Sequence, residues 1–253
     1  MKILGIDVGG SGIKGAIIQT RTGELLTERY RIPTPLPPTP EAVAGVIGQI
    51  ASHFRWEKPI GIGFPAVVQQ GVAKTAANID KSFIGTNVEK LFSKKSGCPV
   101  HVLNDADAAG IAEMKFGAGK DHKGLVLLIT VGTGIGTVLF TRGKLVPNTE
   151  FGHVVLPGRG ITGEQYASDA VREREKLSWK EWALRFNEYL HHLEFLLSPD
   201  LIILGGGVSK EEEKEHYMKH FTIKAPIVLA KLKNNAGMIG AAIAAKRRYK
   251  EKE

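Results

Sequence analysis

The sequence predicts an α/β protein built from two related domains. The main observation is a strand–glycine loop–strand unit that occurs twice, at residues 3–26 and 125–146. Gly9 aligns with Gly132, and Gly12 aligns with Gly134 once one loop residue is skipped. The second observation is that buried apolar strands alternate with amphipathic helices after each copy. A chain of 253 residues is long enough for one large or two moderate domains.

The first copy is expected to contain three strands, a glycine loop and a turn. In chain order these are strand Ile3–Asp7, loop Val8–Gly15, strand Ala16–Thr20, turn Arg21–Gly23 and strand Glu24–Leu26. Glycines permit a tight loop and let an anion approach the backbone closely. After a proline-rich stretch, Thr39 or Thr34 is expected to begin a helix over Glu41–Phe54. The elements expected next are strands Ile60–Pro65 and Val100–Leu103 and helix Ala106–Phe116.

The second copy repeats this order with a shorter loop. Its expected parts are strand Leu125–Thr130, loop Val131–Gly136, strand Thr137–Thr141, a turn at Arg142 and Gly143, and residues Lys144–Val146. Ser178 and Glu181 form a capping-box pattern that opens a helix, which Pro199 ends. Strand Leu201–Leu204 then leads through a glycine run to a helix with Ser209 as its cap. The last helix, about Ala236–Arg248, is rich in Gly and Ala, as a tightly packed helix would be.

Composition narrows the classes of function. Hydrophobic residues make up 43% and charged residues 24% of the chain, which is ordinary for a globular protein. Neither a membrane span nor a secretory leader is recognisable, so a cytoplasmic protein without a membrane partner is expected. Cys98 is the only cysteine, which excludes internal disulfides and Cys-built zinc sites. The net charge of +8 indicates an anionic partner, but no nucleic-acid module is recognisable, so no nucleic acid is expected.

A dinucleotide-binding fingerprint is matched by Gly10, Gly12 and Gly15, but its context is wrong. That fingerprint requires a helix after the glycines, whereas residues 16–20 are expected to form the outgoing strand of a hairpin. No Walker pattern occurs either. The glycine loops are therefore interpreted as two anion-binding hairpins, which a phosphoryl-transfer enzyme would need.

Polar residues beside these loops each allow a functional and a structural reading. Asp7 ends a buried strand and is expected to hold a Mg²⁺ water, or only to cap a turn. Lys14 is suited to meet a phosphate, or only solvent. Asp105, after Asn104, is placed to accept a proton from a hydroxyl, or only to cap a helix.

Carboxylates and an imidazole follow the second glycine loop. They belong to Glu150, His153 and Glu164. A buried sugar needs such a ring of acceptors and donors, because each of its hydroxyls must be paired. Glu and His three residues apart are also common on ordinary surfaces, so the spacing alone leaves both readings open.

Taken in order, these motifs resemble the ROK sugar kinases of the actin/hexokinase/Hsp70-like ATPase superfamily. Within that family the chain is similar to the bacterial polyphosphate glucokinases. The stretches that carry the resemblance are residues 7–14, 75–85, 103–110, 131–136, 147–153, 172–182 and 205–208. The resemblance spans essentially the whole chain.

The resemblance implies two ribonuclease-H-like domains with an interdomain cleft. The first would hold residues 1–103 with the returning C-terminal helix 236–253, and the second residues 104–235. The implied reaction transfers the terminal phosphoryl group of polyphosphate, with ATP as a further donor, to the 6-hydroxyl of glucose. Asp105 would be the general base, and the sugar ligands would be Asn78, Asn104, Asp105, Glu150, His153 and Glu164.

The resemblance assigns the donor to both loops and the later glycine run: the loops at Gly9–Lys14 and Gly132–Gly136 match the family's two phosphate loops, and Gly205–Val208 matches its adenosine motif. The implied residues are Asp7, Gly9, Gly10, Ser11, Gly12, Lys14, Thr130, Gly132, Thr133, Gly134, Gly205, Gly206 and Gly207. The resemblance implies Mg²⁺, with Asp7 as its candidate ligand, and a homodimer. Many ROK proteins carry a zinc-binding Cys cluster, but Pro157–Gly163 contains no cysteine, so no zinc is expected.

Several alternatives stay open at this point. An ATP-dependent ROK hexokinase acting on glucose or mannose would share most of these motifs. A sugar-binding regulator or a filament-forming or chaperone relative would need no catalytic constellation. The cations suggested for a polyphosphate strip could equally form a solvated surface; they are Lys81, Lys94, Lys95, Arg172 and Arg174.

Overall fold

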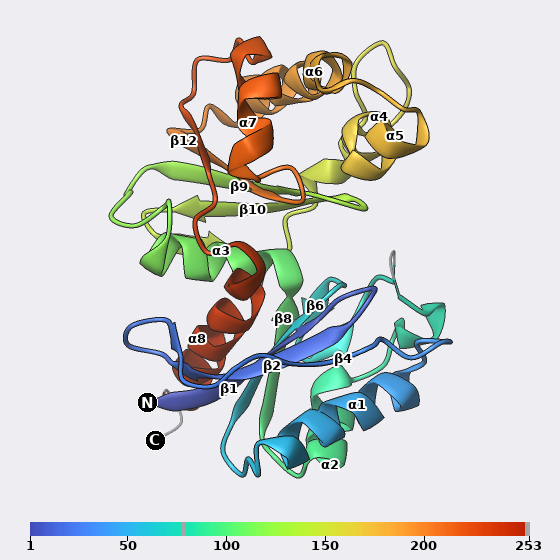
Figure 1. Ribbon diagram of the computed structural model, residues 1–253, viewed down its shortest axis with the longest axis vertical. Helices are drawn as coiled ribbons and strands as arrows, with labels where there is room; N and C mark the ends of the chain where they lie inside the picture. The colour runs from blue at the N-terminus through green and yellow to red at the C-terminus, as the bar shows by residue number, and fades with distance from the viewer. Residues whose placement is uncertain (77–78, 251–253) are drawn as a thin grey trace. The chain divides into compact units, whose positions relative to one another are not determined.

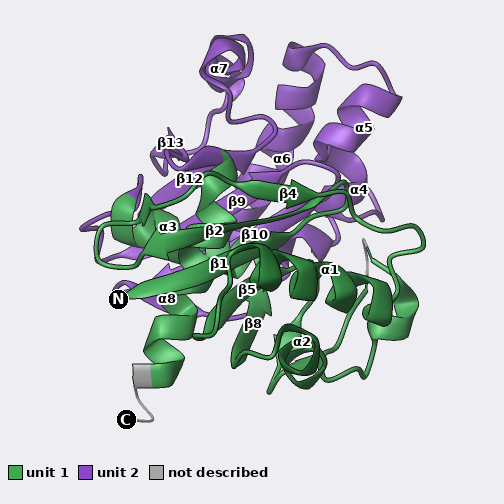
Figure 2. Ribbon diagram, turned by 60° about the horizontal axis from the view of Figure 1, so that its bottom comes forward, with its two compact units in different colours: residues 1–116, 234–253 green, residues 117–233 purple. Residues whose placement is uncertain are grey.

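The computed structural model describes residues 1–76 and 79–250, which form two compact units. Unit 1 contains residues 1–116 and the C-terminal segment from Asn234, and unit 2 contains residues 117–233 (Figures 1 and 2). The sequence suggested a division after residue 103. The units instead divide after residue 116, because helix α3 (Asp105–Phe116) packs along helix α8 (Ala236–Lys250) within unit 1.

Unit 1 is built on a six-stranded sheet. Strand β1 (Lys2–Val8) pairs antiparallel with β2 (Ile13–Gln19) and parallel with β5 (Ile60–Phe64), and β5 pairs parallel with β8 (Val100–Asn104). Two short strands, β3 (Glu24–Leu25) and β4 (Tyr30–Ile32), pair with β2. A separate hairpin joins β6 (Val68–Gln69) to β7 (Val72–Ala73).

Helices cover both faces of this sheet. Leu4 and Ile6 pack with α1 (Pro40–His53) and α2 (Val88–Ser96) in one apolar core. Side chains alternate across a strand, so Gly5 and Gly61 face the other side, where a Cβ would overlap carbonyl oxygens of α8. The Gly- and Ala-rich helix expected at the C-terminus therefore lies directly on the backbone of the sheet.

Unit 2 has a five-stranded sheet in the order β11-β10-β9-β12-β13. Its strands are β9 (Leu125–Val131), β10 (Ile135–Thr141), β11 (Lys144–Val146), β12 (Leu201–Gly206) and β13 (Ile227–Leu229). The helices are α4 (Gly163–Ala167), α5 (Asp169–Arg174), α6 (Trp179–Leu197) and α7 (Glu211–Tyr217). Trp182 and Phe186 of α6 are fully buried against the β9 and β12 side chains, which form the core of this unit.

The two strand–glycine loop–strand units are confirmed. Strands β1 and β2 form an antiparallel hairpin around the first loop, and β9 and β10 do the same around the second. The first loop is shorter than expected, because Ile13–Gly15 belong to β2. The described residues also form short 3-10 turns at Lys81–Phe83, Phe151–His153, Met218–His220 and Lys233–Asn235.

Two of the expected helix caps are confirmed and one is wrong. Thr39 caps α1, and Ser178 and Glu181 form a complete capping box at α6. The expected cap at Ser209 is wrong, because α7 begins two residues later, after Lys210. The Ser209 hydroxyl instead donates to the carbonyl oxygen of Gly206 at 2.8 Å, so it braces the glycine run rather than the helix.

Across residues 1–76 and 79–250, none of the helices has the length and apolar character that crossing a membrane requires.

Candidate active site

Loop 1, residues 9–12, is a tight turn between β1 and β2. The Gly9 N–H donates to the carbonyl oxygen of Gly12 at 3.1 Å, which closes the loop. Asp7 and Lys14 lie opposite one another in the hairpin, and their carboxylate and ammonium groups form an ion pair of 3.0 Å. The alternative in which Lys14 meets only solvent is therefore wrong, since its ammonium contacts Asp7; the proposed roles of the two side chains toward Mg²⁺ and phosphate stay predictions.

Asp7 and Asp105 lie near the same edge of the unit 1 sheet. Strands β1, β5 and β8 are parallel, and Asp7 and Asp105 stand at or just after the carboxyl ends of β1 and β8. Gly63 of β5 lies between them. A Cβ on Gly63 would be 3.7 Å from Asp7 Oδ1 and 3.6 Å from the Asp105 Cα. Ligands of open α/β sheets bind outside the carboxyl ends of the strands, so this edge is the candidate catalytic half-site of unit 1.

Asn104 and Asp105 each accept a backbone N–H at the start of α3. Asn104 Oδ1 accepts the Asp107 N–H at 3.0 Å, as a helix cap does, and its amide lies 3.4 Å from the Ala66 carbonyl oxygen. Asp105 is the first helical residue, and its Oδ1 accepts the neighbouring Ala106 N–H at 2.8 Å. The capping role falls to Asn104, which leaves the general-base assignment of Asp105 as a proposal supported by its place at the sheet edge.

Loop 2, residues 132–134, is the counterpart in unit 2. The Gly132 N–H donates to the Gly134 carbonyl oxygen at 2.9 Å, so this loop closes one residue sooner than loop 1. Thr130, at the loop entrance, donates its hydroxyl to the Gly136 carbonyl oxygen at 3.4 Å. The skipped residue in the sequence alignment is therefore a real shortening of the turn, and Thr133 occupies its tip.

The glycine run Gly205–Gly207 lies beside loop 2. Gly205 and Gly206 pair in parallel with Thr130 and Val131. Gly206 has a φ of +84°, and a Cβ there would overlap the Val131 backbone, so only glycine fits. The Gly207 N–H donates to the Val131 carbonyl oxygen at 2.7 Å. The structure thus brings together in unit 2 two of the segments assigned to the phosphate donor.

Glu164 has a structural contact that the sequence did not reveal. Its Oε2 accepts the Ile135 N–H at 2.8 Å, at the exit of loop 2. The same carboxylate occupies the space that a side chain at Gly134 would need. Glu164 therefore holds loop 2 from the first turn of α4, in addition to its proposed contact with the sugar.

Variants at Glu164 separate these roles. We expect Glu164→Ala to lower kcat/KM for the phosphoryl donor about tenfold more than Glu164→Gln does. The amide oxygen of Gln can still accept the Ile135 N–H, whereas Ala leaves that N–H unpaired. Steady-state kinetics of both variants with saturating glucose would measure this ratio. Equal losses in the two variants would contradict a loop-holding role.

Glu150 and His153 lie at the ends of a single 3-10 turn. The segment is fixed to β10 by the buried Thr137, whose hydroxyl accepts the Phe151 N–H and donates to the Thr149 carbonyl oxygen, both at 2.8 Å. The Glu150 carboxylate and the His153 imidazole are 3.7 Å apart. Desolvation raises the pKa of Glu150 and nearby Glu164 adds to this, while His153 acts in the opposite direction. The two side chains remain partly exposed, as groups that bind a polar ligand must.

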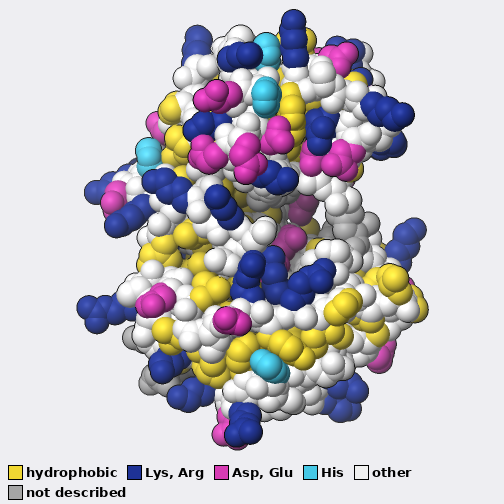
Figure 3. All heavy atoms as spheres, in the orientation of Figure 1, with side chains coloured by type: hydrophobic (Ala, Val, Ile, Leu, Met, Phe, Trp, Pro, Cys, Tyr) yellow, Lys and Arg dark blue, Asp and Glu magenta, His cyan; other side chains and the backbone are white. Residues whose placement is uncertain are grey.

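Four of the cations suggested by the sequence either form ion pairs with neighbouring carboxylates or lie at the sheet edge opposite Asp105. The Arg172 guanidinium pairs with Asp169 at 2.7 Å and stacks 4.1 Å from the Trp179 ring centroid. Arg174 pairs with Glu175 at 3.2 Å. Lys94 and Lys95 lie in the last turn of α2, which leads to the amino end of β8, the edge opposite Asp105. Lys and Arg side chains are exposed over both units in Figure 3, so charge alone does not select a strip.

Arg31, a cation beside loop 1, was not predicted from the sequence as a site residue. Arg31 of β4 donates to the Ser11 carbonyl oxygen at 2.6 Å. No pattern in the sequence singles out Arg31, because β4 contains only three residues and has no period of its own. Asn78, in contrast, lies outside the described residues.

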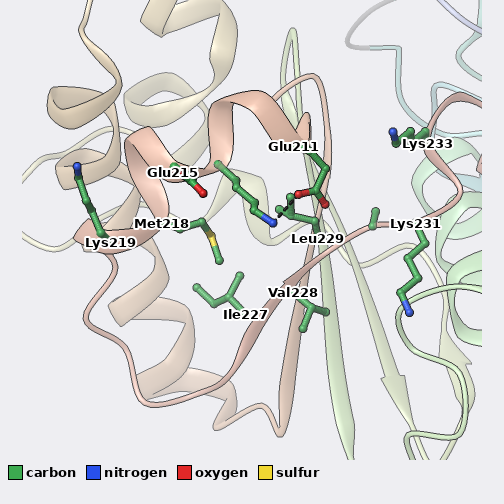
Figure 4. Close-up of a pocket in the computed structure, with 11 residues that line it drawn as sticks. Glu211, Glu215, Met218, Lys219, Ile227, Val228, Leu229, Lys231 and Lys233 are labelled. Atoms are coloured by element: carbon green, nitrogen blue, oxygen red, sulfur yellow. Dashed lines mark ion pairs between the residues drawn. The ribbon is translucent and has the colours of Figure 1, made fainter.

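A cavity of about 760 Å³ opens between α7 and β13 in unit 2. Met218 and Ile227 point into it from the two sides (Figure 4). Lys214 also lines the cavity and pairs with Glu211 at 2.5 Å. Ala230 at one end lies 3.4 Å from the Cβ position of Gly205. The cavity thus borders the glycine run of the candidate donor site.

The match to a family model decides the relationship. The model of the ROK family matches residues 3–164. The chain belongs to the ROK family. It is 45% identical to the polyphosphate glucokinase of Mycobacterium tuberculosis (strain CDC 1551 / Oshkosh) over 241 residues, which cover 95% of this chain and 89% of that protein.

Solved structures of the family agree with this assignment. The inorganic polyphosphate/ATP-glucomannokinase of Arthrobacter sp. strain KM is 44% identical, with a TM-score of 0.92 over 98% of this chain and 99% of that one. A ROK glucokinase of Streptomyces griseus, solved with glucose and AMPPNP, is 26% identical, with a TM-score of 0.83 over 98% and 100% of the two chains. The expected actin-like ATPase fold is therefore confirmed.

Proposed function

We propose that this ROK protein is a polyphosphate glucokinase that transfers the terminal phosphoryl group of inorganic polyphosphate to the 6-hydroxyl of glucose. The observation that carries the proposal is the 45% identity to a polyphosphate glucokinase over 95% of the chain. The two glycine loops and the carboxylates beside them supply the groups that this reaction requires. Its products are glucose 6-phosphate and a polyphosphate shortened by one unit.

The proposed chemistry assigns one role to each group. Asp105 accepts the proton of the glucose 6-hydroxyl as that oxygen attacks the terminal phosphorus, and the bond to the next bridging oxygen breaks. Asn78, Asn104, Glu150, His153 and Glu164 bind and orient the sugar. Backbone N–H groups of loops 1 and 2 stabilise charge on the transferring group. Positioning and electrostatics supply most of the rate, as in phosphoryl transfer generally.

Magnesium is the cofactor proposed for this reaction, where it would offset charge on the donor phosphates. Mg²⁺ is commonly held by one or two carboxylates together with waters and substrate phosphates. Asp7 fits the role of that single carboxylate, because it is partly exposed at the sheet edge and is held in place by Lys14. Among the described residues, no cluster of three or more His, Cys, Asp or Glu is arranged to hold a metal by protein ligands alone.

ATP is proposed as a second donor because of the cavity beside Gly205. Its apolar side chains include Met218, Ile227 and Leu229, and its size lies within the range of pockets that hold small molecules. The phosphates would lie at the neighbouring glycine run. The relative from Arthrobacter is an inorganic polyphosphate/ATP-glucomannokinase, which supports the same proposal.

Parallel donor kinetics test the proposal. We expect polyphosphate to be used at least as well as ATP, with a KM that rises more steeply with salt. Each cation contact with a polyanion releases counterions and steepens the dependence, by about 0.7 in log–log slope per contact on single-stranded nucleic acid. Measurements with several hexoses at each salt concentration would also show glucose as the preferred acceptor, with mannose or glucosamine secondary. Equal salt slopes for the two donors would favour an ordinary ATP-dependent hexokinase.

The same proposal places the enzyme in the cytoplasm as a homodimer, without a nucleic-acid or membrane partner.

A further inference from the structure

Arg31 and Lys14 project from the same face of the unit 1 hairpin. Strand β4 pairs antiparallel with β2, and the register places Arg31 directly opposite Lys14. Directly opposed residues of an antiparallel pair lie on one face of the sheet. Lys14 is neutralised by Asp7 at 3.0 Å. Arg31 is exposed and, within residues 1–76 and 79–250, takes part in no ion pair. The uncompensated charge beside loop 1 is therefore that of Arg31.

The Arg31 guanidinium occupies a defined seat against loop 1. Its Nη2 donates to the Ser11 carbonyl oxygen at 2.6 Å and lies 3.4 Å from the Ser11 hydroxyl. A Cβ on Gly12 would be 2.5 Å from the guanidinium carbon, so Gly12 leaves the space in which the group rests. Thr34, three residues later, donates its hydroxyl to the Gly9 carbonyl oxygen at 2.5 Å. The segment from Arg31 to Thr34 thus forms hydrogen bonds with loop 1 near both of its ends.

The seat leaves part of the guanidinium available. An arginine carries five N–H donors, and the hydrogen bonds that Arg31 makes to described residues use Nη2 alone. A planar guanidinium suits paired hydrogen bonds to phosphate oxygens, and its charge persists at every physiological pH. The group is held beside backbone N–H groups of a loop that is itself suited to anions.

We propose that Arg31 binds a phosphoryl group of the donor at loop 1, and that Gly12 is required to seat its guanidinium. The inference deepens the proposed function and rests on it. It replaces the cations picked from sequence with one whose position the fold determines. The competing reading is that Arg31 only fastens loop 1 through Ser11.

A charge-removing variant separates these readings. Arg31→Gln keeps an amide donor for the Ser11 carbonyl oxygen but removes the charge. We expect the polyphosphate KM at low salt to rise about tenfold, as for loss of one charge-assisted hydrogen bond. The log–log salt slope should fall by about 0.7. The glucose KM should stay within about twofold, because the sugar ligands are untouched.

Two further variants serve as controls. Arg31→Lys keeps the charge, so the salt slope should return to the wild-type value even where the KM remains raised. Arg21→Gln removes the same charge from the turn after the opposite end of β2. Its kinetics and salt slope should match the wild type. Thermal unfolding midpoints of all three variants would show that each is folded.

The outcomes separate this inference from the proposed function. If the wild type uses polyphosphate and Arg31→Gln behaves like Arg21→Gln, Arg31 is not a donor ligand although the function stands. A lowered kcat with an unchanged salt slope would likewise leave only loop fastening. If the wild type uses ATP alone and Arg31→Gln raises the ATP KM, the donor contact stands while the polyphosphate function fails.

Discussion

Asp105→Asn is expected to lower kcat by roughly 10²–10⁴-fold, the usual contribution of a general base. The substitution is conservative for the fold. Asn retains an oxygen that can accept the Ala106 N–H, which Asp105 Oδ1 accepts at 2.8 Å, and the helix cap is supplied by Asn104. Glucose affinity should therefore remain within a few fold and the unfolding midpoint should be unchanged. The measurements are single-turnover kinetics and glucose titration.

A matched control tests whether the loss is local. Asp121→Asn makes the same chemical change at an exposed position with a φ of +68°, a conformation that Asn tolerates. That variant should retain wild-type activity. Turnover near the wild-type rate in Asp105→Asn would remove Asp105 from the proton transfer.

Among the variants considered, Gly240→Ala is expected to lower the free energy of unfolding most. A Cβ at this position of α8 would overlap the carbonyl oxygen of Ala108 in α3. Neither backbone can yield without separating the two helices, so we expect a loss of about 3 kcal/mol, at the upper end of the usual cost of overpacking. For a chain of this size that corresponds to a fall of roughly 6–12 °C in Tm.

Gly45→Ala is the matched control for this effect. Gly45 lies inside α1, and a Cβ there would meet nothing within 4 Å. Ala is the better helix former by up to about 1 kcal/mol, so this variant should be as stable as the wild type or more stable. Calorimetry should give a lowered Tm for Gly240→Ala and an unchanged or raised Tm for Gly45→Ala. A Tm for Gly240→Ala at or above the wild-type value would contradict the close helix packing.

The internal repeat was the part of the fold that sequence could predict best. Each copy consists of two apolar runs separated by glycines, a pattern that marks where each strand begins and ends. Both hairpins form as expected. Strands β4 and β13 were not predicted, because they contain three residues each and carry no period of their own. The first-unit boundary also depends on long-range packing of α3 on α8, which no local pattern contains.

The candidate site shows the same limit. Motif order located Asp7, Asp105 and the glycine loops, because each stands at the end of a strand with a recognisable pattern. The contacts that define their roles join distant residues. Glu164 meets Ile135, and Arg31 meets Ser11, across segments that local sequence cannot relate. The contacts of Arg172 with Asp169 and Trp179 likewise could not be read from charge alone, because they appear only in the folded chain.

The most direct test of the central claim is phosphoryl transfer in the absence of nucleotide. Purified protein, freed of nucleotide, would be given glucose, Mg²⁺ and long-chain inorganic polyphosphate, and glucose 6-phosphate would be measured over time. The proposed function predicts steady product formation that requires both substrates and is lost in Asp105→Asn. No product from polyphosphate, with full activity once ATP is added, would contradict it.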